Sequence, residues 1–140
     1  MRSFAPLPAL LLLFACGAES PEGQVRKVFA EAVKAVEEGD APGAAELLHE
    51  GFRGPEGMNR AEARLYLLGW LRREKVGVTV LSQQVRVQGP QAEQAVEILL
   101  TGTSPGRLLP EDGSRKSLVL RWVRVGRNWR IREIQVAGGG

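Results

Sequence analysis

The sequence holds one cysteine, one histidine and one tyrosine in 140 residues. A single thiol cannot form an internal disulfide, so burial of apolar side chains alone must hold the folded chain together. Side chains suited to catalysis or metal binding are scarce, and the only aspartates, Asp40 and Asp112, fall in predicted turns. A glycine-rich phosphate loop is also missing, because Gly102 to Gly106 lacks the spacing and the lysine. Composition therefore favours a non-enzymatic domain without a metal or cofactor.

No apolar run reaches the roughly 20 residues that a membrane-spanning helix needs. The run from Phe4 to Phe14 is interrupted by Pro6 and Pro8 and ends at Ala15-Cys16. This layout is typical of an export signal, and it resembles a bacterial lipoprotein signal. The resemblance implies cleavage before Cys16 and attachment of a lipid to its sulfur. An ordinary secretory signal with a chance cysteine is the alternative.

The lipoprotein resemblance divides the chain into four parts. They are a signal peptide at 1–15, a short tether from lipidated Cys16 at 16–20, one domain at 21–137 and a disordered tail at 138–140. Lipidation implies a membrane-anchored protein in the bacterial cell envelope. Glycine rather than aspartate at position 17 implies the periplasmic face of the outer membrane.

Charge is nearly balanced, with 19 basic and 16 acidic residues and a formal net charge of +3. Basic residues gather late in the chain, at Arg107, Arg115, Lys116, Arg121, Arg124, Arg127, Arg130 and Arg132. Such a face could bind phosphates, but long basic side chains also cover the solvated outer face of a sheet. We expect the solvated face, and no nucleic-acid partner.

Three helices are predicted in the first half of the chain. Ser20 before Pro21 is typical of a helix start, and apolar residues then recur with helical spacing as far as Gly39. Asp40 is suited to cap a second helix that ends near His49.

A third helix begins at Asn59, where Glu62 three residues later completes a capping arrangement. Its apolar side chains, which include Tyr66 and Trp70, lie on more than one side. A helix of this kind is usually wrapped by other structure, so we expect it to pack inside a curved sheet.

Four strands are predicted in the second half, because the apolar period changes from helical to alternating at Val76. The alternation slips by one residue between Leu81 and Val85, and again between Ile131 and Ile134. Each slip predicts a β-bulge where the sheet bends. The order of elements predicts an α+β fold in which three N-terminal helices pack in a strongly curved antiparallel sheet of four or more strands.

The mature chain resembles the nuclear transport factor 2-like (NTF2-like, SnoaL-like) superfamily over most of residues 21–137. The resemblance is carried by Phe29 with Val33, by Glu37-Glu38-Gly39-Asp40, by Ala44-Ala45-Glu46-Leu47-Leu48 and by Asn128-Trp129-Arg130-Ile131. It implies a cone of bent sheet with helices in its mouth, and sheet faces that can pair in a homodimer. Members include isomerases, dehydratases and cyclases as well as binding domains, so the fold leaves function open.

Three residues are weak catalytic candidates. Glu97 lies on a predicted strand, where it would be an acid or base if it faced the cone, and a partner for an arginine such as Arg121 or Arg124 if it faced outward. Outward is favoured by parity. Tyr66 is expected to pack in the core, and His49 to interact with the C-terminal end of the second helix.

Four aromatic residues are candidates for lining a ligand pocket, although core packing is favoured for each of them: Tyr66, Trp70, Trp122 and Trp129. We therefore expect a non-enzymatic envelope lipoprotein whose domain binds a small apolar or amphipathic ligand or a protein partner. The alternatives are an isomerase or hydrolase that uses the cone, and a dimeric assembly protein that uses the sheet face.

Overall fold

The computed structural model describes residues 19–103 and 114–137. Its elements are α2 (Pro21–Glu37), α3 (Ala41–Glu46), β1 (Leu48–Arg53), a short 3-10 helix (Pro55–Gly57), α4 (Arg60–Arg73), β2 (Lys75–Gln88), β3 (Gln91–Thr103), β4 (Ser114–Val125) and β5 (Asn128–Val136). The predicted signal peptide, Cys16 and the glycine tail lie outside the described residues. Within the two described ranges, no helix is long and apolar enough to cross a membrane.

The five strands form one curved sheet in the order β1-β5-β4-β3-β2. Strands β2 to β5 pair antiparallel, as predicted, and β1 adds a parallel pair with β5. The predicted α+β class with a strongly curved sheet is confirmed. Strand β1 was not predicted, because its residues had been assigned to the end of the second helix and to a break after it.

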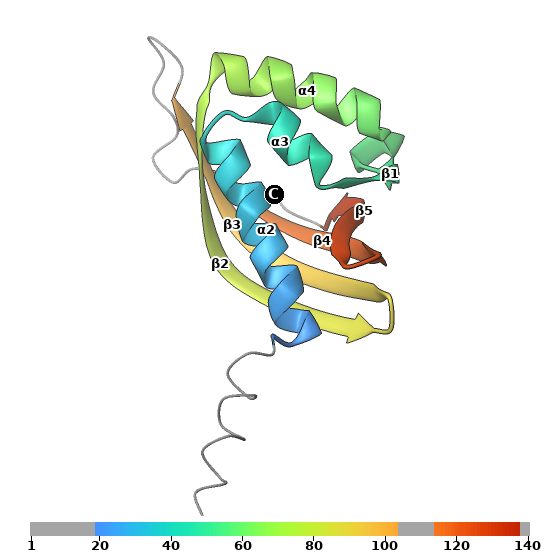
Figure 1. The fold of residues 1–140 in the computed structure, drawn as a ribbon. Coiled ribbons are helices and arrows are strands. Elements are labelled where there is room, and N and C mark those ends of the chain that lie inside the picture. Colours follow the sequence, from blue (N-terminus) through green and yellow to red (C-terminus); the bar gives the residue numbers. More distant parts are fainter. Residues whose placement is uncertain (1–18, 104–113, 138–140) are drawn as a thin grey trace, which may run out of the picture.

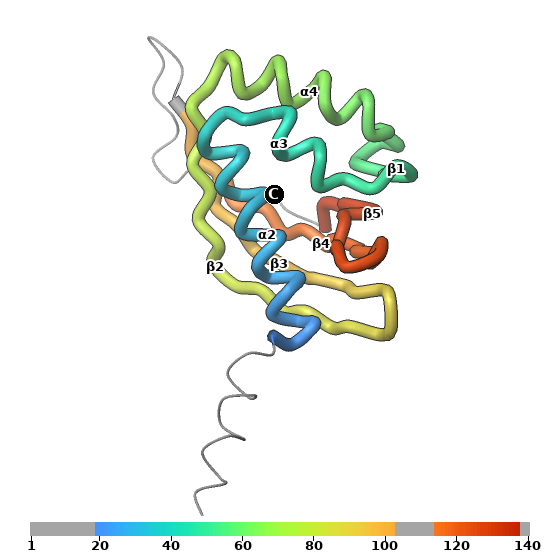
Figure 2. Tube along the Cα trace, in the orientation of Figure 1, coloured from blue at the N-terminus to red at the C-terminus, as the bar shows by residue number. Residues whose placement is uncertain are grey.

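Both predicted bulges are present. The register of β2 with β3 shifts between Val80 and Ser82, and that of β5 with β4 shifts opposite Arg121 and Trp122. Extra residues on one strand of a pair increase its local bend. The tube in Figure 2 shows the resulting curvature of β2 and β3 around α2.

Helix α2 occupies the concave side of the sheet (Figure 1). Val25 and Phe29, one turn apart, are buried in the same apolar cluster as the inward side chains of β3, β4 and β5. The expectation that the third helix packs inside the sheet is wrong. Helix α4 lies at the end of the molecule beyond α3, and Ala63 is its only buried residue.

The predicted helix caps are confirmed. The side chains of Ser20 and Asp40 accept hydrogen bonds from the backbone nitrogens of Gly23 and Gly43, each at 3.0 Å. At α4, Asn59 Oδ1 accepts from Glu62 N at 2.8 Å, and Glu62 Oε1 accepts from Asn59 N at 2.9 Å. This reciprocal pair satisfies two backbone donors that the helix start leaves free.

Replacing Asn59 by alanine is expected to lower the free energy of unfolding by about 1 kcal/mol, because one of these donors loses its acceptor. Urea denaturation followed by circular dichroism measures the change. Asn59→Ser is the matched control, since its hydroxyl can still accept, and it should retain most of the stability. Equal losses from both substitutions would contradict a capping role.

Candidate functional site

The interior of the cone is occupied by large side chains. Those with under 2% exposure are Trp122, Trp129, Leu120, Gln94 and Val25. The two tryptophans come from neighbouring strands, β4 and β5, and belong to one apolar cluster with Phe29 of α2. The expectation that Trp122 and Trp129 pack in the core is confirmed.

A chain of hydrogen bonds joins three polar groups across this interior. Trp122 Nε1 donates to Gln94 Oε1 at 2.9 Å, and Gln94 Nε2 donates to Gln83 Oε1 at 2.9 Å. Gln94 is the only buried polar or charged residue in the described ranges. A carboxamide does not exchange protons near neutral pH, so this chain can orient and satisfy groups but cannot act as a general acid or base.

The glutamines were missed at the sequence level. Gln94 lies between Ala92 and Val96 at positions of the same parity, and both neighbours are buried. A polar side chain at an inward position of a strand needs a buried hydrogen-bond partner, so a glutamine at such a position was the signal in the sequence. A second glutamine acts similarly, since Trp129 Nε1 donates to Gln24 Oε1 at 3.2 Å and ties β5 to α2.

Glu97 faces outward, as its parity predicted, and its carboxylate is solvated. Its partner is Arg115 of β4, with the guanidinium nitrogen 3.0 Å from Oε1. The predicted pairing with an arginine of a neighbouring strand is confirmed, although the arginine is Arg115 and not Arg121 or Arg124. Because Glu97 points away from the cone, it is not placed to act on a molecule held inside.

His49 lies on β1 and not at the end of a helix, so the predicted interaction with a helix terminus is wrong. Its Nδ1 accepts a hydrogen bond from Gly51 N at 2.9 Å. This hydrogen bond holds the His49 side chain against the backbone of its own strand.

Tyr66 is not in the core, contrary to expectation. It lies on the outer side of α4 with 56% exposure, and its ring centroid is 6.0 Å from that of Trp70. These two aromatics and the buried pair Trp122 and Trp129 lie on separate elements. The four pocket candidates therefore do not line one common pocket.

A hollow of about 550 Å³ opens at the hairpin end of the sheet. Its apolar lining includes Val85, Val87, Ala92 and Trp122, and its charged lining includes Glu22 at the start of α2 together with arginines of the sheet. This is the place where a small ligand could touch one of the predicted pocket residues, Trp122. Two hollows border α4, and neither is lined by Tyr66 or Trp70.

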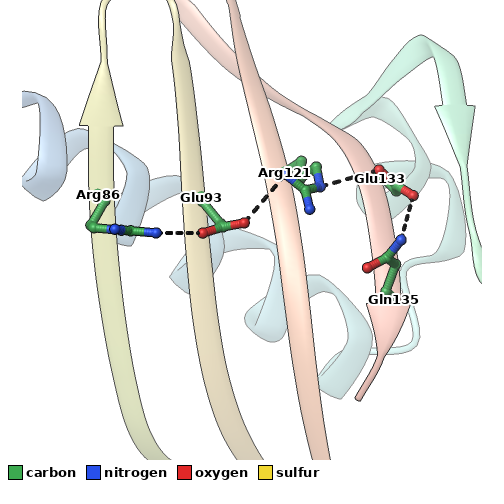
Figure 3. A network of polar contacts seen from close by, with 5 residues as sticks. All are labelled: Arg86, Glu93, Arg121, Glu133 and Gln135. Carbon is green, nitrogen blue, oxygen red and sulfur yellow. Dashed lines mark hydrogen bonds and ion pairs between the residues drawn. The ribbon is translucent and has the colours of Figure 1, made fainter.

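The outer face of the sheet has a row of paired charges (Figure 3). Arg86 and Arg121 contact the two carboxylate oxygens of Glu93 at 3.0 and 3.2 Å, and Arg121 also lies 3.4 Å from Glu133. Gln135 then donates to Glu133 at 2.9 Å. Each exposed pair contributes only about 0–1 kcal/mol. The row neutralises part of the arginine-rich surface and supports the prediction of a solvated sheet face.

No metal centre is formed by the described residues, in which no three histidine, cysteine or acidic side chains gather closely enough to hold an ion. The side chains with potential for chemistry are instead dispersed: Glu97 on the outer face, His49 on β1 and Tyr66 on α4. The structure brings none of these candidates together.

Solved structures share this architecture at low sequence identity. An NTF2-like protein from Cytophaga hutchinsonii superposes with a TM-score of 0.71 at 14% identity, over 86% of this chain and 99% of that one. A protein of unknown function from Mycobacterium tuberculosis gives 0.68 at 15% identity, over 95% and 75%. An uncharacterised protein with a cystatin-like fold from Caulobacter vibrioides gives 0.67 at 15%, over 82% and 88%.

No family model matches the sequence, and no curated protein matches it. The structural likeness nevertheless shows the fold, and the domain has the NTF2-like fold that its sequence motifs resembled. At these identities the likeness carries no residue roles, so function must be argued from the surfaces and the interior of this chain.

Proposed function

We propose that this protein is a lipid-anchored, non-catalytic envelope protein whose NTF2-like domain docks a protein partner. The observation that carries the proposal is the occupied interior. Trp122 and Trp129 are each 1% exposed, and the buried polar group between the sheet and the helix is the neutral amide of Gln94. In a cone filled in this way, binding takes place on the outer surface of the domain and not in an internal cavity.

The dispersal of the titratable candidates supports the same conclusion. A catalytic site needs a base or nucleophile within hydrogen-bond reach of the group that orients it. Glu97 contacts Arg115 on the outer face, and His49 contacts a backbone nitrogen of its own strand. Neither lies beside a second side chain that could share a proton with it in the described residues.

The sequence around Cys16 supports the anchoring part of the proposal. Several acyl chains on one cysteine hold a protein at a membrane more firmly than the single chain that binds only marginally. The predicted tether between Cys16 and Pro21 is five residues, which span at most about 18 Å when fully extended. The domain would thus remain next to the bilayer that holds it.

Native mass spectrometry distinguishes the docking function from the binding of a small apolar or amphipathic ligand. The chain from residue 16 onward, carrying Cys16→Ser, is incubated with an extract of envelope lipids and small molecules. We expect the mass of the bare protein, because the interior is already filled. A reproducible added mass below about 1 kDa would overturn the proposal, since drug-sized ligands bind in pockets of about 300–1,000 Å³.

The rival function is binding of a small apolar or amphipathic ligand, and the hollow beside Trp122 favours it. Val85, Val87 and Ala92 give that hollow an apolar wall, and Glu22 could orient a polar end of the ligand. If an added mass appears, Val85→Asp should abolish it, because a carboxylate would then enter the apolar wall. Val125→Asp, at an exposed position on β4, is the matched control.

A further inference from the structure

Helix α4 exposes two large apolar side chains to solvent. Leu65 is 68% exposed and Tyr66 is 56% exposed, which are the two highest values among the large apolar residues of the described chain. Ala63, the buried residue of the helix, lies roughly opposite Leu65 and about 60° from Tyr66, so Tyr66 borders the packed side. Single exposed apolar residues are ordinary, but adjacent ones that continue along a helix mark an interaction surface.

The rotation of about 100° per residue arranges the exposed face in two rows. One row runs from Leu65 through Gly69 to Arg72, and the next runs from Tyr66 through Trp70 to Arg73. The contact between the rings of Tyr66 and Trp70 shows that the second row is continuous. Each row runs from an exposed apolar residue through a half-buried residue, Gly69 or Trp70, to an exposed arginine.

The charge of α4 is strongly one-sided. It has four arginines, at positions 60, 64, 72 and 73, one glutamate, Glu62, and no lysine. All ion pairs found in the described residues lie between strands of the sheet, so none involves these arginines. Arginine, tyrosine and tryptophan are the residues enriched at energetically dominant positions of protein interfaces, where lysine is depleted.

We propose that the Leu65–Arg73 face of α4 is the docking surface for a protein partner that presents an apolar groove rimmed by carboxylates. The inference rests on the proposed docking function and names its surface. Leu65 and Tyr66 enter the groove, and Arg72 and Arg73 pair with the carboxylates at its rim. Arginine forms two parallel hydrogen bonds with a carboxylate, which fixes orientation as well as affinity.

The exposed face of α4 is far from the point where the tether would join the domain. Helix α2 begins at the hairpin end of the sheet, and α4 lies at the other end (Figure 1). The 17 residues of α2 span about 25 Å, which exceeds the reach of about 18 Å for the five-residue tether. The α4 face is beyond that reach when α2 stands upright on the bilayer, and it meets the bilayer when the domain lies on its side. A membrane as the occupant is therefore an outcome that the experiment must distinguish.

Charge argues against a second copy of this chain. Two α4 helices packed face to face would bring four arginines from each copy together with a single glutamate from each. Like charges in an interface are costly, and they suppress self-association through this face. An acidic partner meets the charge requirement, and a second copy does not.

Photo-crosslinking in the cells that make the protein tests the inference. The full chain carries p-benzoylphenylalanine at Leu65 or, for comparison, at the exposed Ala95 on the outer sheet face. We expect a discrete protease-sensitive product from position 65 and none from position 95. Arg72→Glu with Arg73→Glu should reduce that product at least about tenfold, since close charge pairs contribute strongly to interfaces. Arg26→Glu with Lys27→Glu on exposed positions of α2 changes the charge equally and should leave it intact.

Other outcomes overturn the inference in distinguishable ways. A product from position 95 alone would leave the docking function standing and show that α4 is not its surface. A lipase-sensitive product from position 65 would identify a membrane, and one of twice the chain's mass would identify a second copy. A product insensitive to Arg72→Glu and Arg73→Glu would remove the acidic partner. No product from either position would overturn both the α4 surface and the docking function.

Discussion

Replacing Trp122 by alanine is expected to lower the free energy of unfolding by about 3–5 kcal/mol. Trp122 is 1% exposed and central to the apolar cluster, so its removal leaves a cavity that the surrounding strands cannot fill. The substitution also leaves Gln94 Oε1 without its donor. Because small domains are stable by only about 5–15 kcal/mol, this is a large part of the total. Urea denaturation of the soluble chain measures the loss.

Two matched variants separate packing from hydrogen bonding in that result. Trp122→Phe keeps most of the volume but leaves a buried acceptor unpaired, which costs about 1–3 kcal/mol. Adding Gln94→Leu removes that acceptor and should recover part of the stability. Val125→Ala, at an exposed position of the same strand, should change it by less than about 0.5 kcal/mol. Losses that are the same for Trp122→Ala and Val125→Ala would contradict the filled interior.

Changing Cys16 to serine is expected to abolish both the lipid labelling and the cleavage of the chain. The serine side chain cannot carry the thioether-linked lipid that the lipoprotein resemblance implies, and no other cysteine can substitute for it. Fractionation with metabolic labelling by radioactive palmitate measures both the location and the lipid. We expect labelled membrane protein from the unchanged chain and unlabelled, unprocessed protein from Cys16→Ser.

Gly17→Ala is the matched control for position and size, and it should retain both label and membrane location. If Cys16→Ser also remained in the membrane fraction and released only at high salt, electrostatic attachment would replace lipid anchoring. If the unchanged chain incorporated no palmitate, the ordinary secretory signal would be correct.

Features that depend on neighbouring residues could be predicted from the sequence. The caps at Ser20, Asp40 and Asn59 depend on residues three positions away, and all three are present. Both bulges follow from a slip of parity within one strand. The outward direction of Glu97 follows from the apolar residues on either side of it.

Features that depend on distant pairing could not be predicted. Strand β1 forms because Leu48 pairs with Ile131 of β5, which lies far along the chain, while Gly51 and Gly54 suggested a break. The partner of Glu97 depends on the register of β3 with β4, which places Arg115 within reach. Neither pairing can be recognised from the residues that surround it in the sequence.

The assignment of the inner helix failed for a different physical reason. The apolar side chains of α4 surround it, and this pattern indicates burial without saying which element provides it. Helix α2 fills the concave side with only two large buried residues, Val25 and Phe29. Leu65 and Tyr66 of α4 therefore remain exposed to solvent, and they belong to the surface proposed for docking.

The contact between the first helix and the last strand also constrains how the chain folds. Trp129 Nε1 reaches Gln24 Oε1 across 105 residues of sequence, and β1 obtains its only strand partner in the sheet from β5. Contacts between residues so far apart carry the full entropic cost of closing the loop before they stabilise anything, so they form late and slowly. During synthesis, the elements that precede β5 therefore lack the strand that closes their core until Asn128–Val136 is made. A nascent chain that stays open this long exposes its apolar strands to other chains and to chaperones.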